Sequence, residues 1–258
     1  MQLSAKRQRE TGAFYTPKVW ADKAAEYLKE FIGKTFEDCI FWDCAGGEGA
    51  LLEALPNSVR RIGTTLENED VTIMKNKGIE AYQFDFLDGN FQNLPFWDEV
   101  KNNTERLVIL TNPPYVRLPA SNQPFAKIHY KNNVAEELFI YRICLEINPK
   151  WLAIFTKAGV IQLAYQLWAD TDVLDFFVGG FASCSQQGWG LKGNFGILFS
   201  LFHFDFERYK RHYGFRPQQG SRGLYYTYWA ENPHLESVTR TDLENLGQYV
   251  AKFHVYNS

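Results

Sequence analysis

Short apolar runs alternate with amphipathic stretches along the first two thirds of the chain. Residues 39–44 and 107–110 are apolar runs of strand length, and residues 60–66 and 79–84 are also expected to be strands. In residues 19–32 the apolar positions recur at the three- and four-residue spacing of a helix. This alternation predicts a parallel sheet with helices packed on it.

Further elements are predicted on both sides of a polar, proline-containing loop at 116–133. The helices are expected at 50–55, 71–77, 134–147 and 160–168, and the strands at 151–155, 174–178 and 195–204. For the helix at 71–77 we expect Asp70 as the N-cap and Gly78 as the C-cap. Each polar motif of interest then follows the end of a predicted strand, which is where such sheets bind ligands.

The composition describes a globular chain rather than a tail or a membrane span. Of 258 residues, 45% are hydrophobic and 22% charged, which excludes a wholly disordered chain. No apolar run approaches about 18 residues, and the N-terminus is polar and basic, so neither a membrane nor a secretory signal is expected. The aromatic content of 16% fits either a thick aromatic core or stacking surfaces for flat ligands.

The four cysteines show no metal-ligand spacing. Cys39, Cys44, Cys144 and Cys184 form no C-x-x-C pair and stand at no zinc-finger spacing with a histidine. We therefore expect free thiols in a cytoplasmic protein, without disulfides and without a metal.

Glycines and acidic residues follow the first three predicted strands. The segment 43–49, DCAGGEG, allows a sharp turn with close approach to a ligand, although an ordinary strand-to-helix turn uses glycines too. Asp43 would repel a pyrophosphate and favours an amine-bearing ligand. Glu67 stands where an acidic side chain commonly accepts hydrogen bonds from the ribose hydroxyls, and Asp85 could accept a hydrogen bond from an adenine amino group. Their neighbours Glu69, Asp70 and Asp88 are competing candidates.

Asn112-Pro113-Pro114-Tyr115 follows the fourth strand and carries the most specific signal. An aromatic amine is a poor nucleophile because its lone pair is delocalised into the ring. The Asn112 side-chain oxygen and the Pro113 carbonyl could each accept a hydrogen bond from one N–H group of the amine. These hydrogen bonds would localise the lone pair toward an electrophile. The prolines stiffen the segment, and the Tyr115 ring could stack on a base.

On these motifs, in this order, the chain resembles the S-adenosylmethionine-dependent amino-methyltransferases, specifically DNA adenine methyltransferases of the gamma motif order. The resemblance runs from about Thr11 to Phe204. The segment 11–17 looks like the family's tenth motif, and 43–49 matches D-x-x-x-G-x-G. The start of 134–147, with Glu136-Glu137-Leu138-Phe139, is similar to the helix that follows the family's catalytic loop.

The resemblance implies a fold, a cofactor and a set of site residues. The fold is α/β and Rossmann-like, a mixed seven-stranded sheet with helices on both faces and an antiparallel edge hairpin. The cofactor is S-adenosyl-L-methionine, held by Thr11, Tyr15, Thr16, Pro17, Asp43, Ala45, Gly47, Gly49, Glu67, Asp85, Phe86 and Asn112. The catalytic residues are Asn112, Pro113, Pro114 and Tyr115, with Tyr115 and Phe195 stacking on a flipped target base.

The chain also departs from the family pattern. Cys44, Gly46, Glu48 and Lys157 replace residues that are usual there, and only about 50 residues follow the catalytic domain expected at 1–204. The extension at 205–258 is basic and aromatic, which makes it a candidate DNA contact. The expected DNA-binding residues are Arg117, Lys127, Lys131, Arg208, Lys210, Arg211, Arg216 and Arg222.

The function expected is that of a site-specific DNA methyltransferase that modifies the 6-amino group of adenine after base flipping. Its partners would be DNA and either a separate specificity subunit or its own loop at 116–133 together with 208–222. Two alternatives stay open. One is methylation of RNA amines or of protein glutamine, and the other is an inactive nucleic-acid-binding subunit of a modification complex.

Overall fold

The computed structural model describes residues 15–117, 134–157, 176–184, 189, 196–204, 227–229 and 235–237. By its backbone contacts the chain divides into two compact units, Met1–Ala153 and Ile154–Ser258. The predicted boundary between 204 and 205 stays a prediction. Among the described residues, no helix has the length and apolarity needed to cross a membrane.

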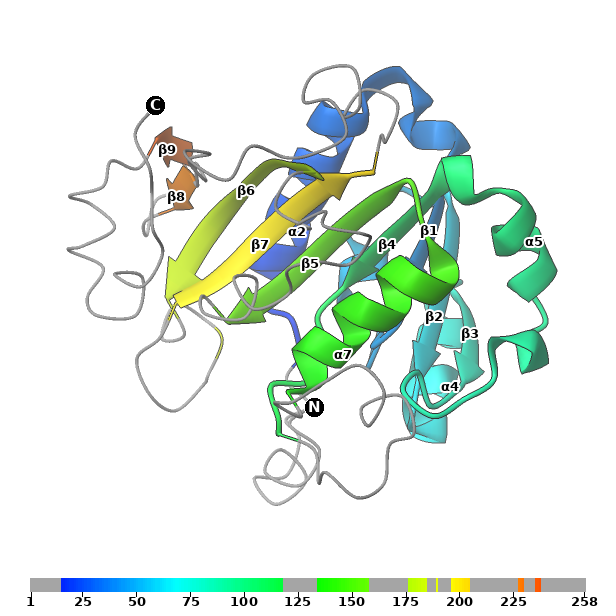
Figure 1. The fold of residues 1–258 in the computed structure, drawn as a ribbon. Coiled ribbons are helices and arrows are strands. Elements are labelled where there is room, and N and C mark those ends of the chain that lie inside the picture. The colour runs from blue at the N-terminus through cyan, green and yellow to red at the C-terminus, as the bar shows by residue number, and fades with distance from the viewer. Residues whose placement is uncertain are drawn as a thin grey trace. The chain divides into compact units, whose positions relative to one another are not determined.

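A parallel sheet forms the centre of the first unit (Figure 1). Its strands are β1 (Ile40–Asp43), β2 (Arg60–Thr65), β3 (Glu80–Gln83) and β4 (Leu107–Thr111), in the order β3-β2-β1-β4. β1 pairs in parallel with both β2 and β4, and β2 pairs in parallel with β3. Every residue of β1 and β4 is buried, as expected for central strands covered on both faces.

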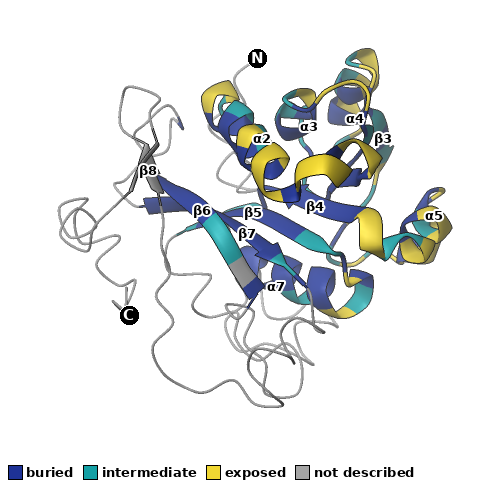
Figure 2. Ribbon diagram, turned by 90° about the horizontal axis from the view of Figure 1, so that it is seen from above, coloured by how far each residue is buried: buried dark blue, intermediate teal, exposed yellow. Residues whose placement is uncertain are grey.

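Helices cover both faces of this sheet. Figure 2 shows α2, α3 and α4 on one face and α7 on the other. The helices are α2 (Lys18–Ile32), α3 (Ala50–Glu53), α4 (Asn68–Asn76), α5 (Trp97–Asn102) and α7 (Ala135–Arg142). Short 3₁₀ helices occupy Gly33–Asp38, Phe91–Asn93 and Thr104–Arg106, and a π-helical turn at Ile143–Ile147 continues α7.

An aromatic cluster fills one side of the first unit. The buried Trp42 ring meets the edges of Phe86, Phe91 and Phe96, with centroids 5.1–6.1 Å apart. Phe86 stacks on Phe139 of α7 at 4.5 Å. Such pairs add to the hydrophobic gain of burying the rings, so many of the chain's aromatic residues serve packing.

The second unit contains an antiparallel pair of strands. β6 (Phe177–Cys184) pairs antiparallel with β7 (Gly196–His203) and parallel with β8 (Thr227–Trp229), which pairs antiparallel with β9 (Leu235–Ser237). Strand β5 (Trp151–Lys157) begins in the first unit and ends in the second. Within the second unit, Phe155 of β5 contacts Phe181 and Phe199.

The predicted strands of the first unit are confirmed, with ends shifted by one or two residues, and three details are corrected. α4 begins at Asn68; its N-cap is Glu67 rather than Asp70, and its C-cap is Lys77 rather than Gly78, which follows with φ +71°. Asp70 is buried in the first turn, where the hydroxyls of Tyr15 and Thr65 donate to it at 3.3 and 3.5 Å. The sixth strand lies at Phe177–Cys184 rather than 174–178. The helix expected at 160–168 and most of the loop at 116–133 lie outside the described residues.

Candidate active site

Four of the predicted site residues lie at or just after the carboxyl ends of the parallel strands. Asp43 ends β1, Asn112 follows β4, and Glu67 and Asp85 come two residues after β2 and β3. Because neighbouring parallel strands end at the same edge of a sheet, this edge collects four segments far apart in the sequence.

Asp43 is a buried carboxyl group, 2% exposed, that links β1 to β4. Its Oδ1 accepts from the Thr111 hydroxyl at 2.9 Å and from the Ala45 amide at 3.0 Å. Burial raises the pKa of Asp43 from 3.8 to about 7, although both hydrogen bonds act to lower it. A neighbouring cation would stabilise its ionised form.

Gly47, within the glycine segment 43–49, lies against the Tyr15 ring. Gly47 has φ +49°, and a Cβ there would lie 3.1 Å from two ring carbons of Tyr15. Gly49 has φ +83° and caps α3. The left-handed backbone and the close ring explain why glycine is needed at Gly47.

Met74 of α4 fills the space that three glycines leave open on the other side of this segment. A Cβ at Gly46 would lie 3.2 Å from the Met74 sulfur, and a Cβ at Gly49 would lie 2.7 Å from its Cγ. A Cβ at Gly63 of β2 would clash with the same sulfur. The buried thioether thus sets how closely α4 approaches the glycine segment.

Asn112 is joined to Thr16 across 96 residues of sequence. Its side-chain nitrogen donates to the Thr16 hydroxyl at 3.1 Å, and both residues are only 8% exposed. This bond fixes which end of the amide faces Thr16, so the carbonyl oxygen points to the other side. Thr16 lies just before α2, whose N-cap is Pro17.

The remainder of the tetrapeptide leads into α7. The Pro114 carbonyl accepts from the Val116 amide at 3.0 Å, and the Val116 carbonyl accepts from the Ala135 amide at 3.0 Å. Burial and the nearby Glu136 carboxylate raise the pKa of the Tyr115 hydroxyl well above 10, so this side chain stays neutral.

Glu67 and Asp85 differ in what their side chains do. Glu67 is half-buried at the N-cap of α4. Asp85 is exposed, and its Oδ1 accepts from the amides of Leu87 and Asp88 at 2.9 and 3.1 Å. Phe86 is 3% exposed within the aromatic cluster, so a ligand would meet its backbone rather than its ring.

A pocket of about 590 Å³ opens beside Asp85 at the carboxyl ends of β2 and β3. Its lining mixes apolar and amide side chains: Leu66, Tyr82, Gln83, Phe84, Asp85, Gly89, Asn90, Asn93, Leu94 and Pro95. Its mixture of rings, amides and one carboxylate suits a flat ligand with polar edges.

Three buried charged residues on α7 add to the predicted site. Glu136 and Glu137 are fully buried in the first turn of α7, where a helix favours negative charge. Arg142, at the other end of α7, is 7% exposed and binds the segment that follows β3. The sequence motif drew attention to Glu136 and Glu137, but nothing in it distinguished Arg142 from a surface arginine.

Other predicted residues lie at the surface or outside the described chain. Arg117 is exposed and pairs with Val134 in an isolated antiparallel bridge. The residues outside the described ranges are Thr11, Lys127, Lys131, Phe195, Arg208, Lys210, Arg211, Arg216 and Arg222. Cys39, Cys44 and Cys144 are buried free thiols, as predicted. Within the described ranges, no group of three or more His, Cys, Asp and Glu could hold a metal ion.

Solved structures share this fold over most of the chain. The type I restriction enzyme EcoKI M protein aligns with 86% of this chain and 49% of its own, at 12% identity and a TM-score of 0.56. A Listeria monocytogenes protein assigned to the class I S-adenosylmethionine-dependent methyltransferases aligns with 79% of this chain and 63% of its own, at 14% identity and a TM-score of 0.52. The fold is that of a Rossmann-like methyltransferase.

The predicted α/β methyltransferase fold, with a mixed sheet and flanking helices, is thereby confirmed, although the described residues form nine strands rather than seven. The type IIG restriction endonuclease BpuSI aligns with 92% of this chain and 32% of its own, at 13% identity and a TM-score of 0.53. By the alignment given above, the chain spans about half the length of the EcoKI M protein. No protein-family model and no curated protein sequence matches it.

Proposed function

We propose that this chain transfers a methyl group from S-adenosylmethionine to the 6-amino group of an adenine in DNA. The observation that carries the proposal is the buried Asn112 amide at the end of β4, whose nitrogen donates to Thr16. This orientation leaves the Asn112 oxygen as the acceptor for an amine, next to the rigid Pro113-Pro114 segment.

The residues at the strand ends fit S-adenosylmethionine by their chemistry. The buried Asp43 carboxyl suits the ligand's ammonium group, and the half-buried Glu67 suits its ribose hydroxyls. The exposed Asp85 beside the 590 Å³ pocket suits the adenine amino group. Gly47 brings bare backbone to this edge, where a Cβ would lie 3.1 Å from two ring carbons of Tyr15.

When bound, S-adenosylmethionine supplies a methyl group on a sulfonium centre, which is already a strong electrophile. The protein then needs to orient the amine and exclude water. The Asn112 oxygen and the Pro113 carbonyl each accept one N–H bond of the target amine, which localises its lone pair away from the ring. The proton is lost after transfer, so no general base is needed beforehand.

Tyr115 supplies a neutral ring next to this acceptor pair. Its raised hydroxyl pKa keeps it uncharged, so the ring can stack on a base without a phenolate charge nearby. An adenine inside a duplex cannot reach the Asn112 oxygen, so the base must be flipped out of the stack.

DNA is the substrate we favour because two of the structural relatives with TM-scores above 0.5 carry restriction-enzyme names. A basic segment, 208–222, follows the catalytic domain expected at 1–204 and supplies candidate phosphate contacts. Target choice would come either from a separate specificity subunit or from the loop at 116–133 together with 208–222.

The test is methyl transfer from labelled S-adenosylmethionine to three acceptors: unmethylated DNA, total RNA and whole protein. Digestion to nucleosides and mass spectrometry should find N6-methyldeoxyadenosine in the DNA arm alone. Asn112→Ala should lower the rate at least about 10²-fold, whereas the exposed Asn76→Ala should match the wild type. Label in RNA or in protein glutamine instead would overturn the choice of DNA, and absence of S-adenosylmethionine binding would overturn the methyltransferase proposal.

A further inference from the structure

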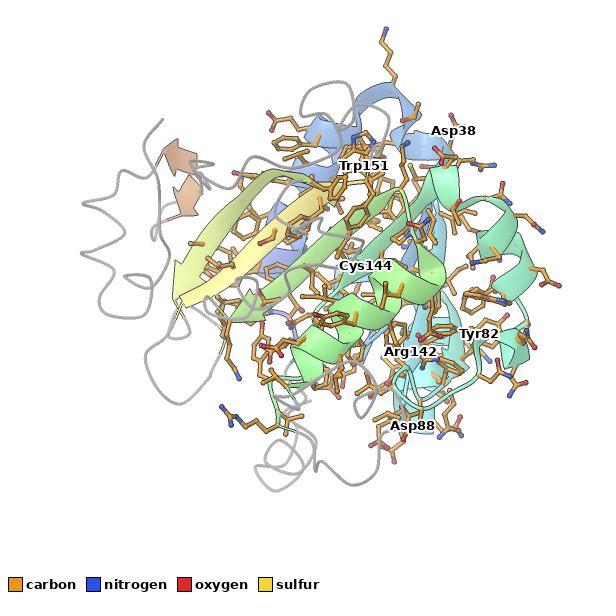
Figure 3. All side chains as sticks on the ribbon, in the orientation of Figure 1. Asp38, Tyr82, Asp88, Arg142, Cys144 and Trp151 are labelled. Carbon is orange, nitrogen blue, oxygen red and sulfur yellow. The ribbon has the colours of Figure 1, made fainter. Side chains whose placement is uncertain are left out.

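Arg142 makes an unusual set of contacts for a residue at the end of a helix. Its guanidinium donates to the carbonyls of Phe86 and Gly89, the latter at 2.8 Å, and to both carboxylate oxygens of Glu146 at 2.7 and 3.1 Å. It also lies 4.1 Å from the centre of the Phe91 ring. Figure 3 labels Arg142 on α7, on the side toward Asp88.

The two carbonyls belong to the turn that presents Asp85. Within this turn the Asp85 carboxylate accepts from the Leu87 and Asp88 amides, and the Asp85 carbonyl accepts from the Gly89 amide at 2.7 Å. Hydrogen bonds within the turn therefore fix its shape, while Arg142 of α7 binds the two carbonyls of Phe86 and Gly89.

The same helix is anchored at its other end to the proposed catalytic segment. The Ala135 amide, at the start of α7, donates to the Val116 carbonyl, and the Val116 amide donates to Pro114. α7 has eight residues, so it spans about 12 Å between these two anchors. One rigid helix thus connects Pro114 to the turn that carries Asp85.

A lysine could not replace this arginine. The guanidinium has five donors in a planar fork, and here they reach two carbonyls and one carboxylate at once. Glu146 balances the charge, and the Phe91 ring covers one face of the guanidinium. A lysine ammonium would reach only part of this set, so the turn would be held less firmly.

We propose that Arg142 is a positioning residue for the adenine end of the cofactor site. It fixes the 85–89 turn so that the Asp85 carboxylate accepts from the adenine amino group, at a set distance from the Asn112 segment. This inference rests on the proposed function, because the role of Asp85 toward adenine belongs to it. Arg142 itself touches neither the cofactor nor the reacting atoms.

Arg61 offers a matched control. It is also buried, 8% exposed, and donates to the carbonyls of Leu52, Leu55 and Gly78 at 3.4–3.5 Å. Those carbonyls lie at the end of α3 and before β3, away from the strand ends that form the site. Arg61→Gln removes a comparable buried arginine and reports the effect of lost stability alone.

The experiment compares binding of S-adenosylhomocysteine with binding of its hypoxanthine analogue, S-inosylhomocysteine, which lacks the 6-amino group. Arg142→Gln should weaken S-adenosylhomocysteine binding at least tenfold and reduce the preference over the hypoxanthine analogue. Arg61→Gln should stay within twofold of the wild type in both. Arg142→Lys, which keeps the charge, should raise KM for S-adenosylmethionine while leaving single-turnover methylation at saturating cofactor within threefold.

Two outcomes overturn the inference: unchanged affinity and preference in a folded Arg142→Gln protein, or an equal loss in Arg61→Gln. If Arg142→Gln does not fold, Arg142→Lys carries the same comparison. Amide hydrogen exchange separates this inference from the proposed function, because it needs no ligand. Amide exchange at Leu87, Asp88 and Gly89 should be at least tenfold faster in Arg142→Gln than in Arg61→Gln. Equal exchange in the two variants would show that Arg142 does not hold the 85–89 turn, whether or not the protein binds a cofactor.

Discussion

Removing the Thr16 hydroxyl should damage the methylation step by releasing the Asn112 amide. Thr16→Val keeps the size of the side chain but removes the acceptor that holds the Asn112 nitrogen at 3.1 Å. Both residues are 8% exposed, so water replaces the lost hydroxyl poorly. Losing a buried hydrogen-bond partner costs about 1–3 kcal/mol.

That cost translates into a defined loss of rate. In Thr16→Val the Asn112 nitrogen has lost this acceptor in the orientation that offers the oxygen to the target amine. Holding the amide in that orientation for methyl transfer therefore costs about 1–2 kcal/mol more than in the wild type. The expected loss in single-turnover rate is therefore about 5–30-fold. Thr16→Ser keeps a hydroxyl and should stay within about threefold of the wild type.

A double-mutant cycle distinguishes this mechanism from a direct role of Thr16 in cofactor binding. At saturating S-adenosylmethionine, Thr16→Val should slow methylation in the wild-type background and have no further effect in an Asn112→Ala background. The reasoning fails if the two substitutions multiply fully, or if Thr16→Val methylates DNA at the wild-type single-turnover rate.

The remaining predictions test the cofactor end, the stacking ring and the DNA contact. Because burial raises the pKa of Asp43 to about 7, its ionised fraction rises from pH 6 to pH 8, so calorimetry should show about tenfold tighter S-adenosylmethionine binding at pH 8 and little change in Asp43→Asn. In fluorescence titrations with base-analogue DNA, Tyr115→Phe should keep flipped-base binding and Tyr115→Ala should lose it, and equal behaviour would exclude stacking. Replacing Arg208, Lys210 and Arg211 together by Ala should lower the slope of log K against log salt by up to about three, whereas an unchanged slope would assign the DNA contact elsewhere.

The strands were predictable because their apolar runs are local signals. β4, with the sequence LVILT, is buried throughout and was placed to within one residue. β6 was misplaced because its sequence, FVGGFASC, contains adjacent glycines that weaken strand propensity, and pairing with β7 supplies what the sequence lacks. α5 was missed because six residues, WDEVKN, are too few to show a helical period.

The sequence predicted where Asn112 and the 43–49 segment lie, because each follows a recognisable strand, while their roles stay predictions. What the motifs could not predict are contacts between distant segments. Thr16 and Asn112 are 96 residues apart, and Arg142 binds carbonyls more than 50 residues earlier in the chain. Backbone carbonyls have no sequence signature, so only the folded chain identifies the arginine that binds them.

The fit of Met74 against Gly46, Gly49 and Gly63 has a consequence for how this sequence can diverge. A methyl group at position 63 needs the volume that the thioether occupies, so the two positions should change together among natural homologues. Alanine at 63 should occur with valine or alanine at 74, and seldom with methionine. A library randomised at positions 63 and 74 and selected for folded protein should show the same dependence. It should retain glycine at 63 with methionine at 74, and alanine at 63 with valine or alanine at 74.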